Sequence, residues 1–222
     1  MSRRAAIVGF AQTSYQPEKK DQHITELVYE AVRAALDHAG LEAKDIDNIV
    51  SCSQDFLDGR TISNRTIPEV EGAYLKGEAK VASDGTQAAI YGALRIMSGK
   101  YKTTLVVAHC KMSEGDQNII ANAMFEPLYH RALGLDDISA AALQARAYLQ
   151  THGLPEEVMA RAAAHSLNHA LDNPLVHRKI KGGPDQVMKS KMLASPLREL
   201  MAFPISDGAC ALVLADEETA KK

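Results

Sequence analysis

The stretch AKVASDGTQAAIYGALRIMSGKYKTTLVVAHCKMS, residues 79–113, decides the fold, because it pairs a helix with a buried strand. A polar turn at 82–85 leads into a helix with apolar residues at helical spacing, and Ser98-Gly99 is a typical helix end. Small side chains on this helix let neighbouring backbones approach closely, so we expect it to be central and buried. The stretch TTLVVA, 103–108, is continuously apolar and β-branched, which predicts a strand covered on both faces. The apolar and small helix positions are Ala88, Ala89, Ile90, Gly92, Ala93, Leu94 and Met97.

Elements before and after this stretch complete an α/β pattern. Residues 5–10 predict a first buried strand, and 24–39 form an amphipathic helix that Gly40 ends. Residues 48–52 predict a second strand, so this helix is a crossover between strands. Residues 210–215, CALVLA, predict the last strand. Helices are expected at 138–149, 158–171 and 184–191, with a loop at 195–197.

The connection 55–74 is unusually polar, with the sequence DFLDGRTISNR at its start. One interpretation is a solvated loop with a short helix at 67–74. The other is a lip over a substrate tunnel, or a contact between subunits, because long loops are enriched in functional residues.

Composition narrows the class of protein. The 222 residues carry a formal net charge of −3, so no basic excess indicates nucleic acid. No apolar run is long enough for a membrane span, and we expect no signal peptide. The cysteines, Cys52, Cys110 and Cys210, are odd in number and widely separated, which favours a reducing cytoplasm over a disulfide framework.

The organising stretch resembles the nucleophile segment of the thiolase superfamily. That segment reads roughly Cys-Ala-Ser-Gly, a small-residue helix, Ser-Gly, a strand and then Glu-Lys-Met-Ser. Ala82 stands at the position of the nucleophilic cysteine in this register, and Asp84 and Cys110 also depart from the pattern. The residues that match are Gly85, Ala88, Ser98, Gly99, Lys111, Met112 and Ser113.

The resemblance extends over nearly the whole chain. Residues 146–177 resemble the thiolase loop domain, and 195–220 resemble the segment that returns from it. The closest branch is that of sterol-carrier and archaeal acetoacetyl-CoA thiolases. The resemblance implies an α/β fold: a thiolase-like layered α/β/α half with a mixed sheet. Its core would be 1–113 and 190–222, and a helical loop-domain insertion would be 114–189. Only the family's first half is matched, and its second half carries a His and a second Cys.

The candidate catalytic residues lie around the helix N-terminus formed by Ser83, Asp84 and Gly85, where free N–H groups favour an anion. Ala82 cannot supply a thiolate. Ser83 or Asp84 is expected to cap the helix; a serine nucleophile would need a base partner. Cys110 is either buried packing or a nucleophile, and because strand residues alternate faces, its neighbour His109 cannot pair with it.

Two further groups of residues are candidate binding sites. His165 and His169 are one helical turn apart, but no third ligand is spaced to join them, so we expect no metal site. Arg178, Lys179 and Lys181 fall where the resemblance implies contacts with coenzyme A, and they could meet its phosphates. A solvated basic loop is the alternative.

The resemblance implies a thiolase-like acyltransferase subunit of a larger assembly. It would form or cleave a carbon–carbon bond next to a coenzyme A thioester, its substrate, with no covalently bound cofactor. Catalytic side chains would come from a second-half thiolase chain, and a small acyl-CoA-binding protein is a further partner that the resemblance suggests. The alternative is a non-catalytic structural subunit that pairs with an active thiolase. Strands apolar on both faces need more cover than this chain supplies, so we expect an obligate oligomer, with a self-dimer as runner-up.

Overall fold

A computed structural model describes residues 3–60, 62–63 and 65–221 of the chain. Thr61 and Asn64, inside the polar connection 55–74, therefore lie outside the described residues. The chain divides into two compact units, one of residues 1–115 with 206–222 and one of residues 116–205. In the described residues, no helix combines the length and apolar character needed to cross a membrane.

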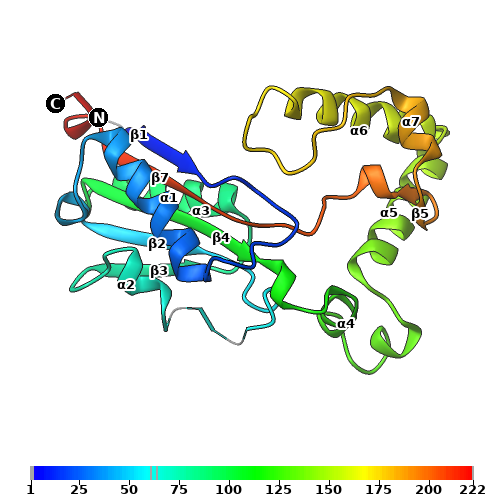
Figure 1. Ribbon diagram of the computed structural model, residues 1–222, viewed down its shortest axis with the longest axis horizontal. Coiled ribbons are helices and arrows are strands. Elements are labelled where there is room, and N and C mark those ends of the chain that lie inside the picture. The colour runs from blue at the N-terminus through cyan, green and yellow to red at the C-terminus, as the bar shows by residue number, and fades with distance from the viewer. Residues whose placement is uncertain (1–2, 61, 64, 222) are drawn as a thin grey trace. The chain divides into compact units, whose positions relative to one another are not determined.

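The first unit is built on a five-stranded mixed sheet with the order β1-β7-β4-β2-β3 (Figure 1). The strands β2, β3 and β4 run parallel, whereas β7 pairs antiparallel with both β1 and β4. The mixed sheet that the resemblance implied is confirmed. The strand bounds are Ala5–Gln12 for β1, Asn48–Cys52 for β2, Gly77–Val81 for β3, Thr103–Lys111 for β4 and Asp207–Asp216 for β7.

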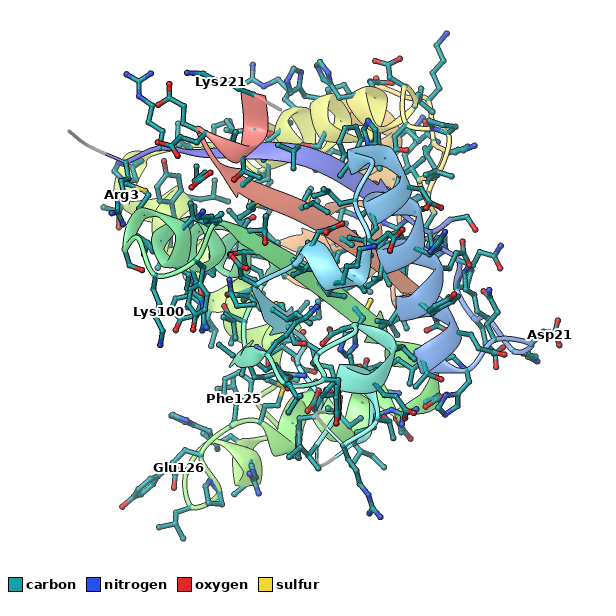
Figure 2. All side chains as sticks on the ribbon, turned by 90° about the vertical axis from the view of Figure 1, so that its left-hand side faces the viewer. Arg3, Asp21, Lys100, Phe125, Glu126 and Lys221 are labelled. Carbon is teal, nitrogen blue, oxygen red and sulfur yellow. The ribbon has the colours of Figure 1, made fainter. Side chains whose placement is uncertain are left out.

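Two long helices, α1 (Ile24–Ala39) and α3 (Gly85–Met97), cover opposite faces of this sheet (Figure 2). Leu105 and Val107 of β4 belong to the apolar cluster under α1, while Val106 belongs to the cluster under α3. Because successive strand residues face opposite ways, a strand covered on both sides must be apolar throughout. This is why the run 103–108 reads as continuously apolar.

The shorter elements of the first unit connect these layers. They are the helix α2 (Ile67–Val70) and the 3-10 turns η1 (Ala43–Asp45), η2 (Met112–Glu114) and η5 (Thr219–Lys221). The strand β3 was not predicted, because its sequence GEAKV lacks an apolar run; it is an edge strand, which needs less cover. The strand β7 begins at Asp207, three residues before the predicted start at Cys210.

The helix α3 differs from the expectation that it is buried all round. One side lies on the sheet through Ala88, Gly92 and Ile96, which are all buried. A second apolar stripe remains exposed, with Ile90 at 58% and Leu94 at 55%. The sheet covers only one side of a helix, and no described element covers the other.

The second unit is mainly helical. Its helices are α4 (Gln117–Ala123), α5 (Asp137–His152), α6 (Glu157–Ala170) and α7 (Pro184–Lys189), with the 3-10 turns η3 (Arg131–Leu133) and η4 (Glu199–Met201). The predicted loop at 195–197 contains part of a short hairpin of β5 (Met192–Ala194) and β6 (Leu197–Arg198). The unit includes residues 190–205, which the sequence had assigned to the core, because Leu200 and Met201 pack on the apolar cluster of α6 and α7.

Candidate active site

A pocket of about 170 Å³ lies where the carboxyl ends of β2 and β4 meet the N-terminus of α3. Parallel strands bring their carboxyl ends to one edge of the sheet, and ligand sites of α/β folds gather at such edges. All residues that line the pocket belong to the first unit. They are Tyr15, Cys52, Ser53, Gln54, Leu57, Asp58, Ser83, Gly85, Ala108, His109, Cys110 and Met112.

The N-terminus of α3 forms one wall of this pocket. Asp84 is the N-cap, and its carboxylate accepts a hydrogen bond of 2.9 Å from the backbone N–H of Gln87. The capping interpretation therefore holds for Asp84. Gly85, at the first helical position, precedes the first backbone hydrogen bond of the helix, which Ala88 donates to Asp84. Amide groups at this position carry the positive end of the helix dipole toward the pocket.

The sulfur atoms near the pocket are held as thiols. The Sγ of Cys110 donates to the carbonyl oxygen of Ser206 at 3.3 Å, and burial raises the pKa of this thiol to about 12. The Sγ of Cys52 donates to the carbonyl oxygen of Ser83, and burial raises its pKa as well. Since the nucleophile of thiol chemistry is the thiolate, this environment favours packing over catalysis for Cys110. Ala82 is exposed and provides no reactive group.

His109 is the most unusual side chain of the pocket. Its side chain is buried, with 5% of the residue exposed, and in the described part of the chain neither ring nitrogen has a hydrogen-bond partner. Burial, together with the nearby positive charge of Lys80, lowers the pKa of His109 to about 4. The imidazole is therefore neutral at physiological pH, with one nitrogen able to donate and the other able to accept.

Asp58 lines the same pocket from the polar connection. One carboxylate oxygen accepts from the backbone N–H of Lys111 at 2.8 Å, and the other oxygen has no partner among the described residues. Burial raises the pKa of Asp58 to about 6. Neither Asp58 nor His109 was predicted from the sequence to be a site residue. The polar cluster in 55–65 was the available signal, but its pattern did not indicate which carboxylate is buried.

The polar connection is folded against the core rather than solvated at its start. Asp55 accepts from the backbone N–H of Ser63 at 2.7 Å and pairs with Lys80 at 3.1 Å. Lys80 also donates to the hydroxyl groups of Ser53 and Ser63. Although burial opposes it, hydrogen bonds from Ser53, Ser63 and Lys80 lower the pKa of Asp55 to about 2. The network fixes the loop that carries Asp58 as a wall of the pocket.

An apolar hollow of about 480 Å³ adjoins the pocket and shares Gly85 and Ala108 with it. Its other lining residues are Phe10, Ala11, Gln12, Thr86, Ala89, Val106, Cys210 and Leu212. The pocket thus opens beside a larger apolar surface.

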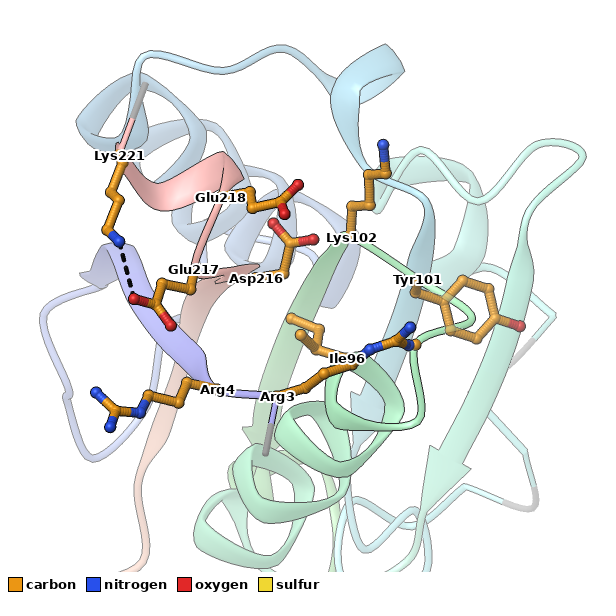
Figure 3. A pocket seen from close by; sticks show the side chains of 10 residues that line it. Arg3, Arg4, Ile96, Tyr101, Lys102, Asp216, Glu217, Glu218 and Lys221 are labelled. Carbon is orange, nitrogen blue, oxygen red and sulfur yellow. Dashed lines mark hydrogen bonds and ion pairs between the residues drawn. The ribbon is translucent and has the colours of Figure 1, made fainter. Parts of the chain in front are cut away.

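A separate hollow of about 500 Å³ lies at the opposite end of the sheet, where β4 begins and β7 ends (Figure 3). Arg3, Arg4 and Lys102 line this hollow together with Asp216, Glu217 and Glu218, and Lys221 donates to Glu217 at 2.8 Å. Its charges offset one another, and it is remote from the N-terminus of α3. We therefore take the smaller pocket as the candidate site.

The remaining candidate residues belong to the second unit. Arg178 donates from one guanidinium nitrogen to the carbonyl oxygens of Glu199 and Ala202, so it holds its own unit together. Lys179 donates to the carbonyl oxygen of Pro174, and Lys181 is exposed. Contacts of these three residues with coenzyme A stay a prediction.

The two histidines of α6 lie close together. The rings of His165 and His169 stack edge to face, with centroids 4.4 Å apart. Over the described ranges, no group of three or more His, Cys, Asp and Glu side chains is placed to hold a metal ion.

The sheet, the capped small-residue helix and the inserted helical unit define a thiolase-type fold. Residues 5–218 match the family model described as "Thiolase, N-terminal domain", and the chain belongs to this family. It is 29% identical to an acetyl-CoA acetyltransferase of Methanocaldococcus jannaschii over 99% of this chain and 57% of that protein. It is 29% identical to a steroid side-chain-cleaving aldolase of Thermomonospora curvata over 98% of this chain and 58% of that protein.

A solved structure described as the Ltp2-ChsH2(DUF35) aldolase is also similar. Its TM-score is 0.79 at 23% sequence identity, with 99% of this chain and 57% of that chain covered. The chain thus spans a little over half the length of these relatives.

Proposed function

We propose that this chain is a thiolase-like subunit that acts on acyl-CoA thioesters and cleaves or forms the adjacent carbon–carbon bond by aldol chemistry. The observation that carries the proposal is Ala82 at the position of the family's nucleophile, next to Ser83 of a pocket whose thiols are held protonated. Thiolysis passes through an acyl group on a thiolate, whereas aldol cleavage needs only proton transfer and stabilisation of an enolate. The name of the aldolase from Thermomonospora curvata supports this choice.

The aldol reaction balances without an oxidant or a covalent intermediate. A base takes the proton of the β-hydroxyl group, and the Cα–Cβ bond breaks. The β carbon leaves as an aldehyde or ketone, and the electron pair stays on Cα as the thioester enolate. A proton then returns to Cα and gives the shorter acyl-CoA. The N-terminus of α3 is suited to the negative charge that develops on the thioester oxygen.

A second polypeptide segment is part of the proposal. The exposed stripe of α3 includes Ile90, Leu94 and Met97, at 58%, 55% and 46% exposure. Burying such surface is worth about 25 cal/mol per Å² before the costs of association. A second-half thiolase chain is the occupant we favour, with catalytic side chains of its own, and a self-dimer is the runner-up. Light scattering at micromolar concentration tests this. A stable monomer with cooperative unfolding would contradict it.

The alternative is a non-catalytic structural subunit. Such a subunit has no need for a pocket with unpartnered buried polar groups, and Asp58 and His109 provide them. This observation favours a catalytic role.

Hydrogen exchange at Cα separates the candidates without knowledge of the natural acyl group. The complex recovered from the native source would be incubated with acetyl-CoA or propionyl-CoA in D₂O, and deuterium in the acyl group measured by mass spectrometry. An aldol catalyst is expected to enolise the thioester and incorporate deuterium without free coenzyme A. Binding of the thioesters without any exchange would support the structural subunit instead.

A further inference from the structure

We propose that Asp58 and His109 are the catalytic pair of this pocket: Asp58 carries the proton, and the neutral His109 donates a hydrogen bond to an oxygen of the acyl-CoA. The inference rests on the proposed function and adds to it the groups of this chain that touch the substrate.

The first argument is that both side chains have buried polar atoms without a hydrogen-bond partner. A buried polar atom without a hydrogen bond is costly, and folded proteins leave few of them. Asp58 is 2% exposed with one oxygen unpartnered, and His109 is 5% exposed with both nitrogens unpartnered. Both line the same pocket of about 170 Å³ beside the N-terminus of α3.

Among the described residues with unpartnered buried atoms, His109 differs in kind from the others. Asp58 leaves one carboxylate oxygen unpartnered and is anchored through the other, which accepts from Lys111. Asn48, Arg60, Arg95 and Arg198 each leave one atom unpartnered, but each side chain is anchored through another of its atoms. In His109, by contrast, no ring atom is satisfied. A ligand oxygen in the pocket would supply the hydrogen-bond partner that the fold does not provide for this ring.

The second argument concerns position. His109 lies on β4, and Asp58 lies on the loop after β2. The carboxylate of Asp58 accepts a hydrogen bond from the backbone N–H of Lys111 on β4. The network of Asp55 and Lys80 fixes the same loop. Both groups are therefore held on supported backbone, as directed proton transfer requires.

The third argument is the division of roles. A neutral imidazole can donate to the thioester oxygen without itself losing a proton, and burial keeps His109 in this form by lowering its pKa to about 4. Asp58, with a pKa of about 6, is ionised near neutral pH and is a stronger base than an ordinary carboxylate. The charged groups that act on Asp58 are Arg60, Asp55 and Asp207.

A single carboxylate can both accept and return the proton that the reaction transfers. Asp58 takes the β-hydroxyl proton as the Cα–Cβ bond breaks, and then returns it to Cα of the enolate. His109 and the N-terminus of α3 hold the thioester oxygen while it is negative. The substrate loses an aldehyde or ketone and keeps its thioester.

The test uses the native complex with Asp58→Asn or His109→Gln in this chain, and measures deuterium uptake into acetyl-CoA and propionyl-CoA. We expect losses of about 100-fold or more for each variant. Binding of the thioesters, followed by calorimetry, should change much less. The wild-type rate should rise with pH through about 6 as Asp58 ionises, and Asp58→Asn should remove this rise. Glu71→Gln is the matched control, because Glu71 is a buried carboxyl group outside the pocket and its loss should leave the rate unchanged.

Thermal unfolding separates catalysis from structure. Asp58→Asn removes a buried carboxylate with an unsatisfied oxygen, so its Tm should equal or exceed that of the wild type, whereas a residue kept for stability would lower it. Asp58→Ser serves as a second variant if the first does not fold. Exchange that survives the Asp58 and His109 substitutions overturns the assignment and leaves the proposed function standing. A wild-type complex with no exchange on either thioester overturns both.

Discussion

Gly92 provides the sharpest test of how α3 packs on the sheet. A Cβ atom added at this position would lie 2.6 Å from Cγ2 of Val106 and 3.0 Å from Cδ1 of Leu214. Carbon atoms of neighbouring side chains normally stay about 3.5–4.0 Å apart. Val106 and Leu214 are both 3% exposed, so neither has free space to move into. Even Gly92→Ala should therefore push α3 away from β4 and β7.

Two opposing contributions, helix propensity and overpacking, determine how much Gly92→Ala changes the free energy of unfolding. Alanine stabilises a helix by about 1 kcal/mol relative to glycine, and overpacking costs about 1–3 kcal/mol. Gly92→Ala should thus lower the free energy of unfolding by about 0–2 kcal/mol. Gly92→Leu adds three more carbons and should cost about 3 kcal/mol or more. At about 2–4 °C per kcal/mol for a chain of this size, the Leu variant should lose about 6–12 °C in Tm.

Denaturant and thermal unfolding of the purified chain provide the assay. Gln87→Leu is the control, because it adds the same side chain to an exposed position of α3 and should change stability by less than about 0.5 kcal/mol. Combining Gly92→Ala with Val106→Ala removes the clashing methyl group, so the double variant should be more stable than additivity predicts by about 0.5 kcal/mol or more. Strict additivity, or an unchanged Tm for Gly92→Leu, would refute this packing.

Three further predictions concern charge, capping and covalent chemistry. Burial raises the pKa of Glu71 to about 7 despite the hydrogen bond from Ser51, so its contribution to stability is complete below about pH 4.5 and is lost as pH rises through 7. Glu71→Gln should then gain about 3 kcal/mol over the wild type at pH 8 but little at pH 4, as measured by urea unfolding. Asp84→Ala removes the N-cap of α3 and should cost about 1 kcal/mol in the same assay, and a variant as stable as the wild type would contradict the capping role. Mass spectrometry of the complex after incubation with acyl-CoA should find no acyl adduct on this chain, with or without iodoacetamide; such an adduct would restore covalent catalysis.

Elements with a strong local pattern were predictable from the sequence. The bounds of α1 and β2 agree with the predicted 24–39 and 48–52, and Gly40 adopts the left-handed conformation that ends α1. Each of these rests on periodicity, chain length and capping chemistry, which neighbouring residues determine. The strand β3 lacks such a pattern, because an edge position does not require apolar residues.

The pocket could be predicted only in part. Its helix wall follows from the turn at 82–85, but the polar wall depends on tertiary structure. Asp58 and His109 lie 51 positions apart in the sequence and come together because the loop after β2 folds onto the end of β4. A carboxylate in a polar loop looks the same in the sequence whether it is solvated or buried. The network of Lys80 with Asp55 and Ser63 makes this difference, and no short-range spacing encodes it.

The two apolar stripes of α3 connect the burial of this helix with the candidate site at its N-terminus. The stripe of Ala88, Gly92 and Ile96 meets the sheet, and the stripe of Ile90 and Leu94 does not. A helix that is apolar on most of its surface is typical of one packed on two sides. The sequence therefore indicates that a second layer exists, but it contains no information on which polypeptide supplies it. The same helix presents its N-terminus to the pocket. Under the proposed function, a segment that covers the second stripe would therefore lie near this pocket, where its side chains could complete an acyl-CoA site.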